Sequence, residues 1–289
     1  MIPSRRYYNL IENDIIKISG SDKCKFLQGI ISNDIDVVEN GKPIYSSMLS
    51  PQGRFLCDFF VFKKKQYFLL ECNKIYSQEI LKKLNMYKLR CNVTFEIENN
   101  LKILLLNTND IDQIVQNIKK VIHFSDPRFK NFFSRMYVDN TDLIKIIDHS
   151  KLNKMTSQSY RDYRLKSYVP DFLEDAESGK SLLMEMRFDQ LNGISWDKGC
   201  YMGQEVTARM KYRNIVKRKI FGVKINYQSF TNSQIEVDGE SIGTLTSNTK
   251  EYGISVINLK QLDSFVGKKI YSGDSTLTVE IPWWAKTTK

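Results

Sequence analysis

The feature that most constrains this chain is the stretch from residue 198 to 209, which reads Lys-Gly-Cys-Tyr-Met-Gly-Gln-Glu-Val-Thr-Ala-Arg. Glycines on both sides of Cys200 permit positive φ and a close approach of the backbone to a ligand, so the stretch predicts a tight turn. From about Gly203 onward it predicts a helix, in which Glu205 and Arg209 form an i,i+4 acid–base pair.

Cys200 is the residue that the pattern favours for chemistry. It stands just before a helix start and close to Lys198, where backbone N–H groups and positive charge favour the thiolate over the thiol. A lone cysteine is more often a small buried apolar side chain, and this alternative stays open. The flanking glycines and the polar pair Gln204-Glu205 favour the functional interpretation, because a core cysteine requires neither.

The segment Lys198-Gly199-Cys200-Tyr201-x-Gly203-Gln204-Glu205 resembles the signature of the YgfZ/GcvT-like folate-binding family. Members of that family support iron–sulfur cluster assembly or repair and, in bacteria, tRNA modification. Shorter blocks that are similar to other family elements are Phe26-Leu27-Gln28-Gly29 with Ser32-Asn33-Asp34, Ser50-Pro51-Gln52-Gly53-Arg54, Asp126-Pro127-Arg128 with Arg135, Tyr163-Arg164-Leu165 with Val169-Pro170, and Leu183-Met184-Glu185. The chain departs from the family pattern at Ser32, Phe133 and Tyr168, and it lacks the proline that usually stands two residues before Glu185.

The resemblance implies an α+β fold of three subdomains, arranged as a cloverleaf around a central folate channel, with a small β-barrel at the C-terminus. Residues 1–215 would form the folate-binding region as two interleaved α+β subdomains, and residues 216–289 would form the barrel. The residues themselves agree with this division, because short strands dominate after Lys219 and Asp238-Gly239 is a strong hairpin signal. The earlier part alternates helices with mostly antiparallel strands, which predicts α+β layers.

The resemblance also implies a site. Cys200 would lie at the mouth of the channel, with Lys198 and Glu205 beside it as the catalytic group, and would contact an iron–sulfur cluster together with ligands from a partner. Glu185 is the favoured folate ligand, because a carboxylate can accept two N–H groups from the aminopyrimidine edge of the pterin. The remaining candidate cofactor-binding residues are Asn33, Asp34, Gln204, Arg209 and Trp196. Two structural alternatives stay open, a helix C-terminal turn at Asn33-Asp34 and an exposed helical glutamate at position 185.

Composition limits the other possibilities. The 289 residues are 42% hydrophobic and 26% charged, as is ordinary for a soluble globular chain. No window approaches the roughly eighteen apolar residues of a membrane span, and the N-terminus lacks the apolar core of a secretory signal. Five scattered cysteines without a Cys-x-x-Cys pair, and two histidines, argue against a zinc finger or a complete four-cysteine iron–sulfur site. They predict a reducing, cytoplasmic compartment.

The net charge of +10 raises the possibility of a nucleic-acid partner. Much of this charge is spread along a chain rich in Lys, Ile and Asn, which does not place it on one surface. The best local cluster follows the signature and consists of Arg209, Lys211, Arg213, Lys217, Arg218 and Lys219. It could attract phosphate or a polyglutamate tail, and an ordinary solvated surface is an equal alternative.

Three functions therefore remain, and whether the protein catalyses a reaction is left open. The first is a tetrahydrofolate-dependent factor for iron–sulfur cluster assembly or repair, which handles a transient cluster with assembly or client proteins. It would support tRNA modification and other cluster enzymes indirectly. The second is a one-carbon transferase of the aminomethyltransferase type, whose members carry an aspartate in the helix after the strand that corresponds to 67–72. Residues 72–79 contain no aspartate, and Glu79 is the available substitute. The third is an RNA-binding accessory protein that uses the basic cluster.

Overall fold

The computed structural model describes residues 3–39, 41–116, 121–129, 132–226, 233–260 and 270–286. The chain divides into two compact units. The first comprises Met1–Met48, Cys57–Ser157 and Asn192–Met202, and the second comprises Leu49–Leu56, Gln158–Leu191 and Gly203–Lys289. The signature segment thus passes from the first unit into the second between Met202 and Gly203.

The first unit contains two five-stranded sheets. One has the strand order β3-β4-β5-β2-β6, with β5 paired antiparallel to both β4 and β2. Its strands are β2 (Asn13–Ser19), β3 (Ile44–Leu49), β4 (Phe55–Lys64), β5 (Tyr67–Asn73) and β6 (Thr94–Ile97). Its helices are α1 (Lys23–Gln28), α2 (Ile35–Glu39) and α3 (Lys74–Tyr87).

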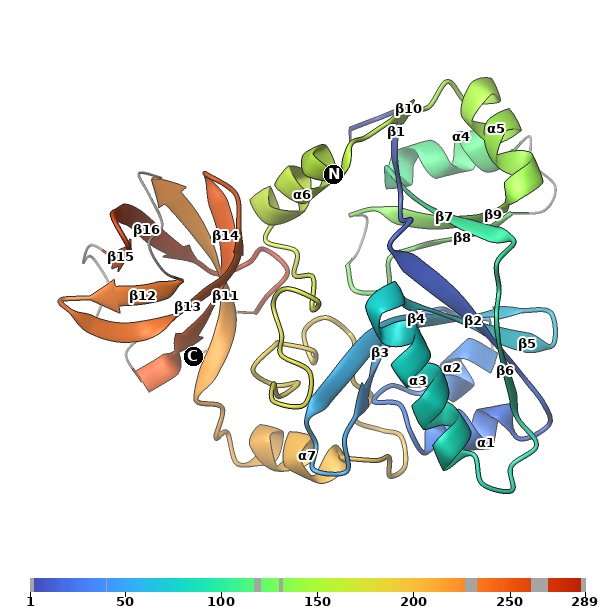
Figure 1. The fold of residues 1–289 in the computed structure, drawn as a ribbon, viewed down its shortest axis with the longest axis horizontal. Helices are drawn as coiled ribbons and strands as arrows, with labels where there is room; N and C mark the ends of the chain where they lie inside the picture. The colour runs from blue at the N-terminus through green and yellow to red at the C-terminus, as the bar shows by residue number, and fades with distance from the viewer. Residues whose placement is uncertain are drawn as a thin grey trace. The chain divides into compact units, whose positions relative to one another are not determined.

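Helix α3 shows why these elements form where they do. The side chain of Asn73 caps it by accepting a hydrogen bond from the backbone N–H of Ile75 at 3.0 Å. Its buried residues Ile80 and Leu84 are four positions apart, so they share the face that lies against β2, β5 and β6 (Figure 1).

The other sheet has the order β10-β1-β7-β9-β8, in which only the β1–β10 pair is parallel. Its strands are β1 (Arg6–Asn9), β7 (Leu101–Leu106), β8 (Ile122–Ser125), β9 (Ser134–Asp139) and β10 (Asn153–Lys154). The helical elements η1 (Thr108–Asp110), α4 (Ile111–Val115) and α5 (Asn140–His149) belong to this part, and α4 and α5 lie on one side of the sheet (Figure 1). The two sheets share a core in which Phe62 and Leu69 of the first meet Ile103 and Tyr137 of the second.

The second unit is dominated by a closed six-stranded barrel, in the order β11-β14-β13-β12-β15-β16 (Figure 1). Its strands are β11 (Arg218–Asn226), β12 (Gln234–Val237), β13 (Glu240–Asn248), β14 (Tyr252–Asn258), β15 (Ile270–Ser272) and β16 (Ser275–Glu280). Asp238 and Gly239 both have positive φ, +51° and +83°, as a two-residue hairpin between right-twisted strands requires. Apolar side chains from alternate strand positions fill the barrel.

Two helices complete the second unit, α6 (Ser157–Lys166) and α7 (Gln204–Tyr212). Between them, residues 167–191 form turns rather than regular elements. No helix among the described residues is both long and apolar enough to cross a bilayer.

The predicted fold class is confirmed, since α+β layers precede a closed C-terminal barrel. Local details differ. The sequence predicts two short strands around Asn13-Asp14, but the turn between them lies at residues 10–12 and β2 already begins at Asn13. The sequence also predicts a helix near residues 110–122, but α4 ends at Val115, and residues 117–120 lie outside the described residues.

The order of Pro51 and Gly53 predicts a type II turn in the segment Ser50–Arg54, but the structure differs from this prediction. The N–H of Gly53 donates to the carbonyl of Ser50 at 2.8 Å, so Pro51 and Gln52 are the central residues. A type II turn needs positive φ at the second central residue, but here it is Gly53, one residue later, that has φ +75°.

Candidate functional site

Residues 192–202 are the first-unit segment that includes Lys198–Met202 of the signature. Main-chain and side-chain hydrogen bonds fix this segment to residues 29–33. The hydroxyl of Ser32 donates to the carbonyl of Gly193 at 2.6 Å, and the carbonyl of Ser32 accepts from the N–H of Ser195 at 3.1 Å. Further along, the N–H of Met202 donates to the carbonyl of Gly29 at 3.0 Å. The loop that carries Cys200 is therefore held on both sides of the cysteine.

Lys198 makes the central contact between the two segments. Its ammonium group donates to the carbonyl oxygens of Ile31 and Asn33, each at 2.8 Å, and lies 5.1 Å from the ring centroid of Tyr201. Burial lowers the pKa of Lys198 from 10.5 to about 8, with the carboxylates of Asp34 and Asp36 opposing the shift. The lysine predicted to favour the Cys200 thiolate thus directs its hydrogen bonds to the main chain.

Asn33 uses its amide group within the protein. Its Nδ2 donates to the carbonyls of Tyr45 and Asn192, both at 2.8 Å, and its Oδ1 accepts from the N–H of Asp34 at 2.8 Å. Both amide donors are thereby engaged, so Asn33 holds the loop and has no N–H left for a cofactor.

Asp34 has a similar local role. Its Oδ1 accepts from Nε2 of Gln28 at 2.8 Å and from the N–H of Asp36 at 3.0 Å, next to the start of α2. The alternative for Asn33-Asp34 was a turn at the C-terminus of a helix. A turn is present there, but it precedes helix α2, which begins at Ile35.

Cys200 is the one exposed thiol of the chain, whose five cysteines all lie in the described residues. Burial raises the pKa of the Cys57 and Cys72 thiols, which lie in the sheet, whereas Cys24 and Cys91 are half-buried. The apolar, buried alternative for Cys200 is therefore wrong. Trp196, four residues earlier, is half-buried in the same loop.

In the second unit the signature continues into α7. Gly203 precedes the helix with φ +79°, and a Cβ atom there would lie 2.5 Å from the carbonyl oxygen of Ser50. Glycine is required at this position by both its conformation and its space. Gln204 and Glu205 begin the helix, and Glu205 forms an ion pair with Arg209 at 2.5 Å on the exposed face.

Glu185 also belongs to the second unit. It is buried in the turn region, so the alternative of an exposed helical glutamate is wrong. Its Oε2 accepts from Nε of Arg218 at 3.0 Å, and its carbonyl accepts from the N–H of Ile220. The side chain lines a cavity of about 830 Å³ together with Lys180, Arg218, Thr244 and Asn258.

The predicted site residues thus fall into two groups. In the first unit, Asn33, Asp34 and Lys198 lie together and Cys200 and Trp196 are on the loop that they hold. In the second unit, Gln204, Glu205 and Arg209 share α7, and Glu185 lies apart from them on the wall of the cavity. No group of three or more His, Cys, Asp or Glu side chains in the described residues is arranged to bind a metal ion.

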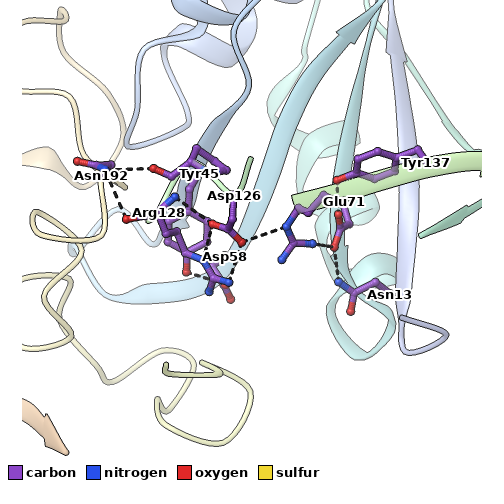
Figure 2. A network of polar contacts seen from close by, with 10 residues as sticks. Asn13, Tyr45, Asp58, Glu71, Asp126, Arg128, Tyr137 and Asn192 are labelled. Atoms are coloured by element: carbon purple, nitrogen blue, oxygen red, sulfur yellow. Dashed lines mark hydrogen bonds and ion pairs between the residues drawn. The ribbon is translucent and has the colours of Figure 1, made fainter. Parts of the chain in front are cut away.

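Sequence reasoning missed a buried ionic network in the first unit, which Figure 2 shows. Glu71 of β5 accepts from Nη1 of Arg135 at 2.5 Å, from the Tyr137 hydroxyl at 2.5 Å and from Nδ2 of Asn13 at 2.6 Å. Arg135 also donates from Nε to Asp126 at 3.2 Å. One signal was a glutamate inside the apolar run Phe68-Leu69-Leu70-Glu71-Cys72, since a buried acid must have a partner.

Arg128 extends this network. It binds Asp126 through Nε and Nη2, each at 3.1 Å, and its guanidinium lies 5.1 to 5.2 Å from the ring centroids of Phe60 and Tyr45. Burial alone would raise the pKa of Asp126, but the charges and hydrogen bonds of Arg128 and Arg135 outweigh burial and lower it.

Asn192 connects the network to the signature loop. Its Nδ2 donates to the carbonyl of Pro127 at 3.1 Å, while its own carbonyl accepts from Nδ2 of Asn33 at 2.8 Å. Asn192 holds this position with φ +55°, a conformation that asparagine adopts more readily than most residues.

Comparison with known proteins agrees with this architecture. Residues 12–142 match the family described as GCVT N-terminal domain, and residues 218–287 match the family described as CAF17, C-terminal beta-barrel domain. The first match runs from near the start of β2 into α5, and the second spans all six strands of the closed barrel.

Among individual proteins, the chain is similar to mitochondrial iron–sulfur cluster assembly factors named IBA57 or IBA57 homolog. It is 30% identical over 273 residues to the homolog from Neurospora crassa, covering 87% of this chain and 62% of the relative. It is 22% identical over 309 residues to the human protein, covering 98% of this chain and 86% of the relative. The chain spans less than two thirds of the Neurospora crassa and Mus musculus relatives, 62% and 64% of their lengths.

A solved structure with the same fold is the glycine cleavage system aminomethyltransferase T from Bartonella henselae. It superimposes with a TM-score of 0.78 at 11% identity, over 96% of this chain and 85% of that chain. At this identity the likeness shows the fold alone.

The relatives correct one prediction. The scattered, unpaired cysteines predict a cytoplasmic location. This prediction is contradicted, because the similar assembly factors are mitochondrial by name. Free thiols indicate a reducing environment only, and they do not distinguish one reducing compartment from another.

Proposed function

We propose that this protein is a folate-binding factor in iron–sulfur cluster assembly, with Cys200 as its key thiol. The observation that carries the proposal is a single exposed cysteine on a loop fixed by Lys198, Asn33 and Ser32. Similarity to assembly factors over most of the chain supports it. Cluster-dependent enzymes, including those that modify tRNA, would depend on it indirectly.

The number of ligands determines how Cys200 can act. An iron–sulfur cluster is held by four protein ligands, usually cysteine thiolates, and this site offers one exposed cysteine. The cluster is therefore a cargo that Cys200 shares with ligands of a partner protein. A fixed loop suits this role, because it presents the sulfur in one position and reduces the ordering cost of complex formation.

Glu185 fits the proposed folate. Arg218 holds one carboxylate oxygen of Glu185, and the side chain lines a cavity whose volume of about 830 Å³ lies in the range of small-molecule sites. A carboxylate so held can accept N–H groups from the aminopyrimidine edge of a pterin. Bound tetrahydrofolate would supply one-carbon or redox chemistry, while the residues of this chain bind and orient it.

The two alternatives have weaker support. Helix α3 of this chain contains no aspartate, and Glu79, the available substitute for the transferase aspartate, forms an ion pair with Lys83 at 3.4 Å on the helix surface. For RNA binding, the number of cations in the basic cluster that can bind phosphate is reduced, because Arg209 pairs with Glu205 and Arg218 pairs with Glu185.

Replacement of the thiol tests the role in cluster assembly. Cells depleted of this protein would receive the wild type, Cys200→Ser or the control Cys91→Ser, and the activities of [4Fe–4S] enzymes would be measured. We expect loss of these activities with Cys200→Ser and wild-type activities with Cys91→Ser. Full rescue by Cys200→Ser would refute the proposed function, whereas a transferase or RNA-binding protein would tolerate the change.

Titration with tetrahydrofolate tests the cofactor. Binding would be followed by tryptophan fluorescence, with Trp196→Phe to identify the reporting residue. Glu185→Gln should weaken binding about 10- to 100-fold, the effect of losing a charge-assisted hydrogen bond. The control is Glu177→Gln, which changes a carboxylate of the same cavity that already pairs with Lys180. Equal affinities of the two variants would contradict the assignment of Glu185.

A further inference from the structure

The end of α7 and the residues after it form an exposed surface that the proposed function does not yet use. It combines large apolar side chains, Tyr212 at 73% and Ile215 at 47% exposed, with the exposed cations Lys211, Arg213 and Lys217. We call these five residues the α7 patch. Exposed apolar side chains surrounded by polar ones often mark interaction sites.

The structure separates this patch from the rest of the basic cluster. Arg209 pairs with Glu205, Arg218 pairs with Glu185 and Lys219 is buried. Within the described part of the chain, Arg213 and Lys217 form no ion pair. The positive charge available to a partner is therefore centred on the residues that flank Tyr212 and Ile215.

The composition of the α7 patch favours a protein over RNA. An RNA backbone is bound by rows of cations that neutralise successive phosphates, and here the row is interrupted by an isoleucine and by two internally paired arginines. Tyrosine and arginine beside an aliphatic side chain are instead typical of the residues that dominate protein–protein binding energy. The Nζ of Lys211 lies 5.6 Å from the ring centroid of Tyr212, which adds a cation–π contact on the helix surface.

Covalent connection keeps the α7 patch close to Cys200. Gln204, the first residue of α7, is four positions after Cys200, a distance of at most about 15 Å along a fully extended chain. The helix then rises about 12 Å from Gln204 to Tyr212. A standard interface of roughly 800 Å² per partner is about 30 Å across, so one partner can cover the α7 patch and reach the thiol.

We infer that the α7 patch is the docking surface for the protein that shares the cluster with Cys200, and that this partner presents acidic side chains around an apolar contact. This inference rests on the proposed function, because that function requires a partner with cluster ligands. Opposite charge would speed the encounter, and Tyr212 and Ile215 would supply the contact area.

Crosslinking in cells identifies the partner. A benzoylphenylalanine at position 212 is compared with one at position 271, since Tyr271 is an exposed tyrosine of the barrel. The expected result is a crosslink from position 212 to an acidic, cluster-binding protein that position 271 does not give. A nuclease-sensitive crosslink to RNA, or no crosslink specific to position 212, would overturn the inference.

Charge reversal then tests the surface. Affinity for the crosslinked protein, loaded with its cluster, is measured for the wild type, Arg213→Glu with Lys217→Glu, and the control Lys224→Glu with Lys250→Glu, which changes two exposed barrel lysines. We expect the first double variant to bind at least about tenfold more weakly and to lose enzyme maturation, while Cys200 still reacts with a thiol reagent. The control should match the wild type, and raised salt should weaken wild-type binding.

The outcomes separate the two proposals. Wild-type maturation by the Arg213→Glu, Lys217→Glu variant, in cells where Cys200→Ser fails, would overturn the docking surface and leave the proposed function intact. Full activity of Cys200→Ser would overturn both. Loss with the α7 patch variant and with Cys200→Ser, but not with the barrel control, supports both.

Discussion

The first unit buries charge in two different ways. In the sheet network, Arg135 is matched by two carboxylates, Glu71 and Asp126, at 2.5 and 3.2 Å. In the signature loop, Lys198 is also buried, yet its ammonium donates to the carbonyl oxygens of Ile31 and Asn33, and its pKa falls to about 8. The carboxylates of Asp34 and Asp36 oppose this fall without pairing with Lys198.

The difference shows what each arrangement serves. The network connects the two sheets, and each of its buried charges has an oppositely charged partner. Removal of any charged member would leave a buried charge unmatched. Main-chain hydrogen bonds, by contrast, fix the loop through neutral carbonyl partners of the Lys198 ammonium. The loop is therefore held in place at a cost in stability.

The largest expected effect comes from breaking the network. Arg135→Met should lower the free energy of unfolding by about 3–5 kcal/mol, because buried Glu71 loses its charged partner and buried Asp126 keeps only Arg128. The control is Lys17→Met, which removes an exposed pair with Glu96 and should cost less than about 1 kcal/mol. Urea denaturation measures both, and a loss below 1 kcal/mol for Arg135→Met would show that the network contributes little.

The next effect concerns the glycine that begins α7. Gly203→Ala should cost about 2 kcal/mol or more, since alanine would have to adopt φ +79° and would approach the Ser50 carbonyl to 2.5 Å. Gly179→Ala is the matched control, with φ +80° and no atom within 4 Å of the added Cβ, and should cost only about 1 kcal/mol. Thermal unfolding of both variants compares them, and equal losses would mean that the close approach to Ser50 is unimportant.

Lys198 should give a pH dependence of intermediate size. Its pKa is about 8 in the folded protein and 10.5 in an unfolded chain, so between these values the unfolded chain holds a proton that the folded protein has released. The contribution of Lys198 to the free energy of unfolding should then rise between about pH 8 and 10.5, by at most about 1.4 kcal/mol per pH unit. Below pH 8 this contribution should not change with pH. The difference in unfolding free energy between the wild type and Lys198→Met, measured across this range, isolates the effect. A flat difference would mean that Lys198 stays protonated.

The smallest effect belongs to the surface pair of α7. Arg209→Ala should cost only about 0.3–0.5 kcal/mol, because Glu205 is 82% exposed and water screens the pair. Chemical denaturation in low and high salt would detect it, and salt should remove most of the difference. A loss above 1 kcal/mol would instead indicate that Arg209 has a packing role.

Elements with strong local patterns could be predicted from the sequence. Strands β4 and β5, helix α3 and the Asp238-Gly239 hairpin carry apolar periodicity or turn residues within a few positions. Helix α6 was missed because only Arg164 and Leu165 of its residues are buried, so tertiary contacts rather than an apolar face stabilise it. Strand β8 has an alternating pattern too short to distinguish from a loop.

The site could be predicted only in part, because some of its contacts are local in sequence and others are not. The exposed thiol and the helix after it follow from neighbouring residues, as does the Glu205–Arg209 pair. The partners of Lys198 are carbonyls about 165 residues away, and Glu71 and Arg135 are 64 residues apart. Residue types alone do not reveal such distant pairings. Asn33 was therefore predicted to bind a cofactor, whereas its amide donates to the carbonyls of Tyr45 in β3 and of Asn192.

Because the Asn33 amide is fully engaged, its loss by deamidation would disturb the loop. Hydrolysis of the amide to a carboxylate would remove both donors and set a negative charge against the carbonyl oxygens of Tyr45 and Asn192. Attraction would become repulsion at the point where residues 29–33 hold the cysteine-bearing loop. A slow, spontaneous reaction at one side chain could thus release Cys200 from its fixed position without touching the sulfur itself.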